Sequence, residues 1–191
     1  LIQVGNLKKE VLSFEDPRPY PEERLVQAVG TVTDGYDGMP VLLSEPNRAK
    51  PLLQKAYREA ATTPDRMVYA KLLAALGDAT GVELLLEKLQ QADGWDEGWN
   101  FRAGGQFGAN MSSLDSIVYL LGQAGDARAL AAILEKARQL EPQSAFSHFR
   151  AVALATERLG DPDAADVLAR LLRMPGIRGY AVTGRADVLD K

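Results

Sequence analysis

The stretch YAKLLAALGDATGVELLLEKL, from Tyr69 to Leu89, decides the fold, because two imperfect copies of it follow along the chain. A Gly-Asp dipeptide marks the same point in each copy, at 77–78, 125–126 and 160–161. Apolar residues recur five, eight, nine and twelve positions after each glycine, a spacing that places them on one face of a helix. The residues at these positions are Val82, Leu85, Leu86 and Leu89, then Leu130, Ile133, Leu134 and Ala137, then Ala165, Leu168, Ala169 and Leu172.

Each copy is expected to form a helical hairpin with a tight turn at its glycine. A glycine just past a helix supplies the left-handed backbone that often ends it, and Asp78, or Thr80 two residues later, can cap the helix that follows. Because one hairpin cannot bury the apolar faces of both its helices, neighbouring hairpins must stack. Further helix caps are expected at Thr63, at Ser112 with Asp115, and at Asp161.

The predicted fold class is all-α: an α-solenoid of stacked helical hairpins, which is a HEAT-like or armadillo-like superhelix of right-handed sense. Residues 1–46 are expected to form an N-terminal extension and a degenerate first repeat, with 1–4 as a short strand or a frayed end. Residues 47–191 are expected to form the HEAT-like repeat domain. The expected helices cover 22–29, 47–60, 64–76, 80–91, 113–124, 126–140, 145–159 and 162–173.

Composition excludes several classes of function. The net charge of −4 and the pI of about 5.1 argue against a nucleic-acid partner, which usually requires a basic face. No apolar run is long enough to span a membrane. The absence of cysteine excludes disulfides and thiolate metal sites, and it leaves the redox compartment open. Because the chain has a single histidine, His148, a multi-histidine metal centre is excluded. Because the chain begins with Leu1, we expect it to be a piece of a longer protein.

An aromatic and glycine-rich insertion at 93–108 interrupts the repeats and holds both tryptophans of the chain. Long irregular segments of this kind are usually functional or pack as a unit of their own. One interpretation is contact with another domain or a protein partner. The other is that the tryptophans fill a gap between repeats, with their indole nitrogens bonded to backbone carbonyls. The candidate contact residues are Trp95, Trp99, Asn100, Phe101, Arg102, Gln106 and Phe107.

Several motifs in and after the insertion resemble one family. They are WDEGWNF at 95–101, GQFG at 105–108, SLDS at 113–116, SHFRA at 147–151 and PGIRGY at 175–180. Together they resemble the C-terminal helical region of certain large bacterial FAD-dependent oxidoreductases, in which a Rossmann-type flavin domain comes first and HEAT-like helices follow. The resemblance covers the chain from about Pro40 onward.

This resemblance implies a non-catalytic interaction or scaffold domain beside a flavin domain in the parent chain. The phosphate-binding Gly-x-Gly-x-x-Gly is absent, so FAD is expected in the parent protein and not in this chain alone. The alternative is a free-standing HEAT-repeat adaptor that binds a protein or peptide on its concave face. The least favoured hypothesis is an enzyme in its own right.

No catalytic, cofactor-binding or metal-ligating residue is predicted. His148 has Ser144 and Ser147 near it in sequence, but no Gly-x-Ser-x-Gly nucleophile motif accompanies them, so a structural histidine at a repeat junction is favoured. The neighbouring carboxylates Asp96 and Glu97 are expected to be solvated, because nothing in their pattern separates their pKa values as acid–base chemistry requires.

Overall fold

The computed structural model describes residues 19–35, 37–99 and 111–177, and every regular element in these ranges is helical. The all-α class is therefore confirmed. The chain divides into two compact units, Leu1–Ala49 and Lys50–Lys191. The α-helices are α2 Glu22–Thr31, α3 Met39–Ser44, α4 Pro46–Glu59, α5 Thr63–Ala75, α6 Val82–Gln90, α7 Ser113–Ala124, α8 Ala129–Arg138, α9 Phe146–Leu159 and α10 Ala165–Leu172.

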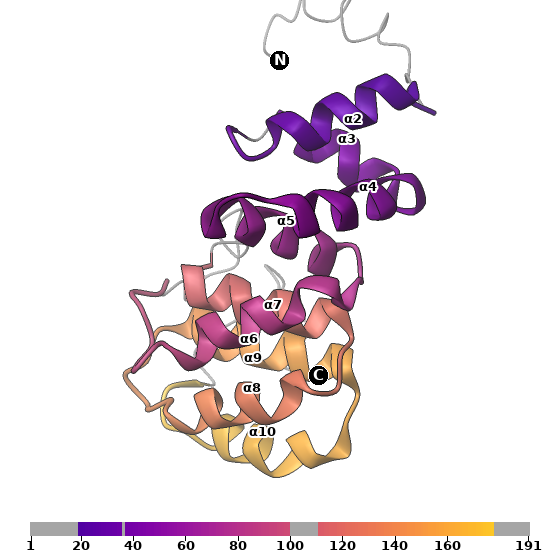
Figure 1. The fold of residues 1–191 in the computed structure, drawn as a ribbon. Helices are drawn as coiled ribbons and strands as arrows, with labels where there is room; N and C mark the ends of the chain where they lie inside the picture. The colour runs from indigo at the N-terminus through magenta and orange to yellow at the C-terminus, as the bar shows by residue number, and fades with distance from the viewer. Residues whose placement is uncertain (1–18, 36, 100–110, 178–191) are drawn as a thin grey trace, which may run out of the picture. The chain divides into compact units, whose positions relative to one another are not determined.

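In the first unit, α2 packs against α3 (Figure 1). The apolar run at 41–43 was not among the expected helices, yet it forms α3, whose Val41 and Leu42 are buried. Gly38 precedes this helix and lies close to α2, because a Cβ atom there would be 2.4 Å from the Ala28 carbonyl oxygen. Only glycine allows so close an approach of the two backbones.

In the second unit, the hairpin helices form two layers (Figure 1). The first helices of the hairpins contact one another in order, α5 with α7 and α7 with α9. The second helices do the same, α6 with α8 and α8 with α10. The buried apolar faces of both layers meet in one core, with Leu85, Leu121 and Ile133 each 0% exposed.

The turn chemistry of the repeat is confirmed at all three hairpins. The three glycines adopt the left-handed conformation, with φ of 72° at Gly77, 70° at Gly125 and 67° at Gly160. An aspartate follows each glycine, and its carboxylate accepts a hydrogen bond from the backbone N–H two residues on, with distances of 2.9 Å for Asp78, 3.0 Å for Asp126 and 3.0 Å for Asp161.

Of the two expected caps before α6, the structure selects Asp78, which caps the short 3-10 turn Ala79–Gly81 that leads into this helix. The cap of α5 is Thr62, one residue before the expected Thr63. The difference at α5 is local, because either neighbouring threonine can reach an unsatisfied N–H of the first helical turn.

The third repeat buries a different set of residues from the one expected. Ala164, Val167 and Leu171 are buried, whereas Leu172 is 68% exposed and Leu168 is half-buried. The buried positions thus lie one residue earlier, relative to the glycine, than the spacing of the first repeat indicates. Among the described second helices, α10 packs against α8.

The Gly122→Ala substitution in α7 should destabilise the protein by about 1–3 kcal/mol, the usual cost of overpacking. The added Cβ would lie 2.4 Å from the Ala155 Cα and 2.8 Å from the Ala155 carbonyl oxygen in α9. Helix propensity alone favours alanine by about 1 kcal/mol, so the clash must reverse the sign. Urea denaturation followed by circular dichroism measures the change.

The control for this substitution is Gly30→Ala in α2. A Cβ atom at Gly30 meets nothing within 4 Å. Alanine there should raise the free energy of unfolding by about 0.5–1 kcal/mol, because propensity acts without a clash. A stabilising effect of Gly122→Ala would show that α7 and α9 do not approach at this glycine.

Candidate functional site

Residues 93–99, the described part of the insertion, form a segment without helix that we call the aromatic segment. Its first end is tied to α8 by two hydrogen bonds. The Trp95 indole Nε1 donates to the Lys136 carbonyl oxygen at 3.1 Å, and the Lys136 amine donates to the carbonyl of Ala92 at 2.6 Å, just before the segment. The indole thus bonds a backbone carbonyl between repeats, as the packing interpretation of the insertion expects.

The other end of the aromatic segment is tied to α7 and α9. The backbone N–H of Leu114, in the first turn of α7, donates to Asp96 Oδ2 at 3.1 Å. The Trp99 N–H donates to the Ser147 hydroxyl at 3.0 Å, and the Ser147 N–H donates to the Trp99 carbonyl, also at 3.0 Å. Asp96 and Trp99 therefore satisfy N–H groups of the first turns of both helices, which have no partner within their own helix.

A buried carboxylate–imidazole pair lies beneath the aromatic segment. Asp115 in α7 is 0% exposed and His148 in α9 is 3% exposed. The His148 Nδ1 atom lies 2.6 Å from Asp115 Oδ1. Asp115 also forms the expected capping box, since it accepts from the Ser112 N–H at 2.9 Å while its own N–H donates to the Ser112 hydroxyl at 3.1 Å.

The environment of Asp115 keeps its carboxyl group ionised. Burial is the largest single influence and raises the pKa, but hydrogen bonds from His148, from Ser147 and from the backbone of Ser112 together lower it below its ordinary value. An ionised carboxylate only accepts hydrogen bonds, so His148 Nδ1 carries the proton in this contact. The pair therefore fixes the orientation of the imidazole ring.

The aromatic segment covers the imidazole ring. The Trp95 and His148 ring centroids are 4.5 Å apart, with an angle of 30° between the ring planes. Gly98 lies against the ring edge, because a Cβ atom there would be 2.5 Å from His148 Cε1 and 2.7 Å from Nε2. A glycine at this position is therefore required for the close approach.

This geometry makes His148 a positioning residue. A serine–histidine–aspartate catalytic arrangement needs a serine hydroxyl at the imidazole nitrogen that faces away from the carboxylate. The nearest serine in sequence, Ser147, instead donates its hydroxyl to the Asp115 carboxylate and accepts a hydrogen bond from the Trp99 N–H. The hydrogen bonds of the Asp115–His148 pair thus hold α7, α9 and the aromatic segment together.

The two tryptophans of the insertion are placed differently. Trp95 is partly buried against the core, whereas Trp99 is 46% exposed. The other candidate contact residues lie outside the described part of the chain: they are Asn100, Phe101, Arg102, Gln106 and Phe107.

Sequence reasoning did not find the partner of Asp115 or the role of Asp96. The spacing of Ser112 and Asp115 predicted the capping box, but His148 is 33 residues away in sequence. Asp96 was expected to be solvated, yet Oδ2 binds the α7 N-terminus and Oδ1 is buried. The only available signal was the presence of a lone histidine close to an acidic cap in an adjacent repeat.

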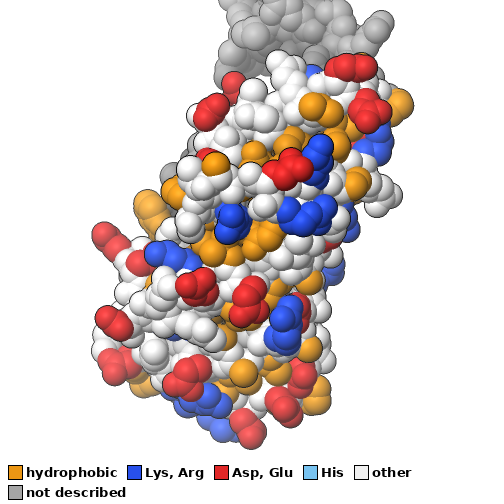
Figure 2. Space-filling view, in the orientation of Figure 1, with side chains coloured by type: hydrophobic (Ala, Val, Ile, Leu, Met, Phe, Trp, Pro, Cys, Tyr) orange, Lys and Arg blue, Asp and Glu red, His pale blue; other side chains and the backbone are white. Residues whose placement is uncertain are grey.

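Three further features of the described residues are their surface charge, their membrane-span potential and their metal-ligating groups. On the face drawn in Figure 2, acidic and basic side chains are interspersed. None of the described helices is both long enough and apolar enough to traverse a bilayer. The part of the chain that the structure describes contains no cluster of three or more histidine, cysteine or acidic side chains suited to a metal ion. Comparisons of the chain with protein-family models, curated proteins and solved structures found no match.

Proposed function

We propose that this chain is a non-catalytic helical-repeat domain for interaction or scaffolding, built as a HEAT-like α-solenoid. The two layers of helices and the left-handed glycine turn repeated at Gly77, Gly125 and Gly160 support this architecture. Repeats of this kind stack through contacts between neighbours and present extended surfaces for binding. The hydrogen bonds of Asp78, Asp115, Asp126 and Asp161 serve packing and capping, which suits a scaffold.

We further propose that it serves as the C-terminal accessory domain of a larger FAD-dependent oxidoreductase. The resemblance of the motifs in and after the insertion suggests this role. The aromatic segment is the contact surface that the structure supports best. The aromatic segment is held to three helices, and it presents Trp99 at 46% exposure. A large aromatic side chain on a preorganised segment loses little entropy on binding, which favours its use as an interface anchor.

The visible absorption spectrum of the complete gene product, measured beside that of this chain, tests the accessory role. We expect flavin bands in the complete product and none in this chain alone. If neither contains flavin after reconstitution with FAD, the oxidoreductase proposal is wrong. The free-standing HEAT-repeat adaptor, which binds a protein or peptide partner, then becomes the favoured function.

Replacing Trp99 with alanine should weaken the binding of this chain to the separately produced flavin domain by about 30-fold, the effect of a 2 kcal/mol interface anchor. Titration calorimetry of the two pieces measures the affinity. The matched control is Leu172→Ala, which truncates another exposed apolar side chain, on α10. Equal affinities of the Trp99→Ala variant and the unmodified chain would exclude Trp99 as the anchor while leaving the flavin test unaffected.

A further inference from the structure

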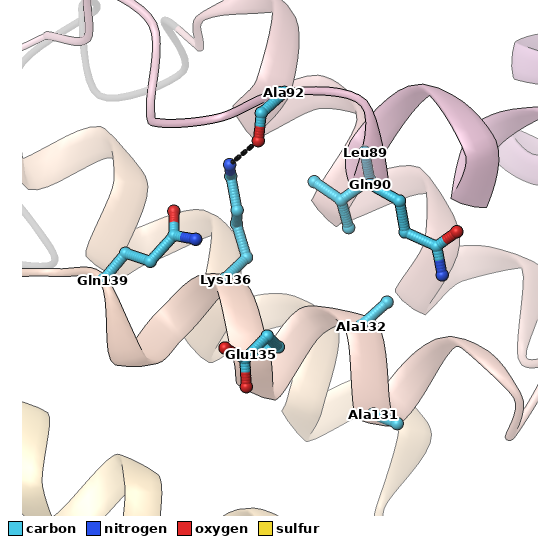
Figure 3. Close-up of a pocket in the computed structure, with 8 residues that line it drawn as sticks. All are labelled: Leu89, Gln90, Ala92, Ala131, Ala132, Glu135, Lys136 and Gln139. Carbon is cyan, nitrogen blue, oxygen red and sulfur yellow. Dashed lines mark hydrogen bonds between the residues drawn. The ribbon is translucent and has the colours of Figure 1, made fainter.

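A pocket of about 350 Å³ opens between the end of α6 and the outer side of α8 (Figure 3). Its apolar lining comes from Leu89, Ala92, Ala131 and Ala132. The volume lies within the range of small-molecule sites, which are mostly apolar with a few convergent polar groups. Asp115, His148 and Trp99 are not among the residues that line this pocket.

The lysine of this pocket is buried to an unusual degree. Lys136 is only 4% exposed, whereas lysines are almost never fully buried in proteins. Figure 3 shows its side chain extending from α8 to the carbonyl of Ala92, with Leu89 and Gln139 on either side. That contact uses one of the three N–H donors of a charged lysine.

Burial increases the fraction of this amine that is neutral, compared with an ordinary lysine. Desolvation lowers the pKa of Lys136, and the nearby carboxylates of Asp93 and Asp96 oppose the shift without cancelling it. The neutral amine is a nucleophile, and lysines activated by an apolar pocket form imines with carbonyl compounds.

We propose that Lys136 is a covalent attachment site for small, uncharged aliphatic aldehydes that enter this pocket. The amine nitrogen attacks the carbonyl carbon and forms a carbinolamine. Loss of the carbinolamine hydroxyl with a proton as water then leaves a C=N bond to Lys136. The reaction consumes one aldehyde and releases one water, and it needs no oxidant or reductant.

The surroundings of the amine select the class of aldehyde. The four apolar lining residues favour a hydrocarbon chain. Asp93 and Asp96 act on the amine electrostatically, and Glu135 also lines the pocket, so an anionic aldehyde meets like charges. The carboxylate of Glu135 also forms an exposed ion pair with Arg138 at 2.9 Å.

Competitive labelling of the folded chain tests the proposal without any substitution. The chain is treated at neutral pH with butanal and cyanoborohydride, which reduces each imine to a stable secondary amine, and peptide mass spectrometry then follows each lysine. We expect Lys136 to be labelled faster than exposed Lys88 on α6, because the lowered pKa of Lys136 leaves a larger fraction of its amine free. Equal or slower labelling of Lys136 would overturn the proposal.

A pocket-filling variant separates pocket entry from chance reactivity. Ala132→Leu places a larger side chain in the pocket and should slow labelling of Lys136 several-fold without changing that of Lys88. The matched control is Ala153→Leu, the same change at an exposed position of α9, which should leave both rates unchanged. Unchanged labelling of Lys136 in a folded Ala132→Leu variant would contradict entry through this pocket. Equal rates with glyoxylate and butanal would contradict the preference for uncharged aldehydes.

Discussion

Replacing Asp115 with alanine should lower the free energy of unfolding by about 3–5 kcal/mol, the usual cost of removing one partner of a buried charged pair. The substitution leaves His148, the Ser112 N–H and the Ser147 hydroxyl without their shared acceptor in a site that is closed to water. Urea denaturation followed by circular dichroism measures the loss. A loss below 1 kcal/mol would show that the pair does not hold α7 to α9.

The difference in free energy of unfolding between the unmodified protein and Asp115→Ala should also depend on pH. The pKa of Asp115 in the folded protein is lowered from its ordinary value of 3.8, so its stabilising effect is fully present above that value. The effect is lost as the pH falls through the lower folded pKa, because the carboxylate must then be protonated in both states. The difference between the unmodified protein and Asp115→Ala should therefore shrink in acid below pH 3.8.

Two further variants distinguish the pair from general damage. Glu157→Ala removes an exposed carboxylate from α9 and should change stability by no more than about 0.5 kcal/mol. In a double-mutant cycle, Asp115→Ala and His148→Ala should cost less together than the sum of their separate effects, because both break one interaction. Strict additivity of the two effects would contradict a coupled pair.

Leu85→Ala should lower the free energy of unfolding by about 2–5 kcal/mol, as buried leucine truncations do. Leu85 is 0% exposed and belongs to the core between the two helix layers. The truncated side chain leaves a cavity, and because the hairpins are closely packed, the neighbouring helices can fill it only in part. Thermal and urea denaturation measure the loss, and a cost near zero would mean that the assigned core is wrong.

The third repeat supplies graded controls for Leu85. Leu168, at the equivalent position of the sequence repeat, is only half-buried, so its truncation should cost less than that of Leu85. Leu172 is 68% exposed, and Leu172→Ala should change stability by no more than about 0.5 kcal/mol. The order Leu85, Leu168, Leu172 thus tests the observed register against the one that the spacing predicted, in which all three are buried.

The candidate site could be predicted only where its chemistry is local. The Ser112–Asp115 capping box was predicted because its members are three residues apart and any helix start of this spacing can form it. The insertion was recognised by composition, and its tryptophans were assigned two interpretations. The structure places Trp95 inward and Trp99 at the surface. Nothing in the order of residues 95–99 distinguishes these two indoles, because each depends on what lies opposite it.

By itself, the sequence determined the described helices other than α3, their order and the glycine turns at Gly77, Gly125 and Gly160. Helical periodicity, caps and left-handed glycines act over a few residues, so they can be read from neighbouring positions. Only the tertiary structure decided the Asp115–His148 pair, the hydrogen bond from Trp95 to Lys136 and the shifted register of α10. Trp95 and Lys136 are 41 residues apart in sequence. Each of these depends on contacts between helices distant in sequence, where packing selects one pairing among many that local pattern allows.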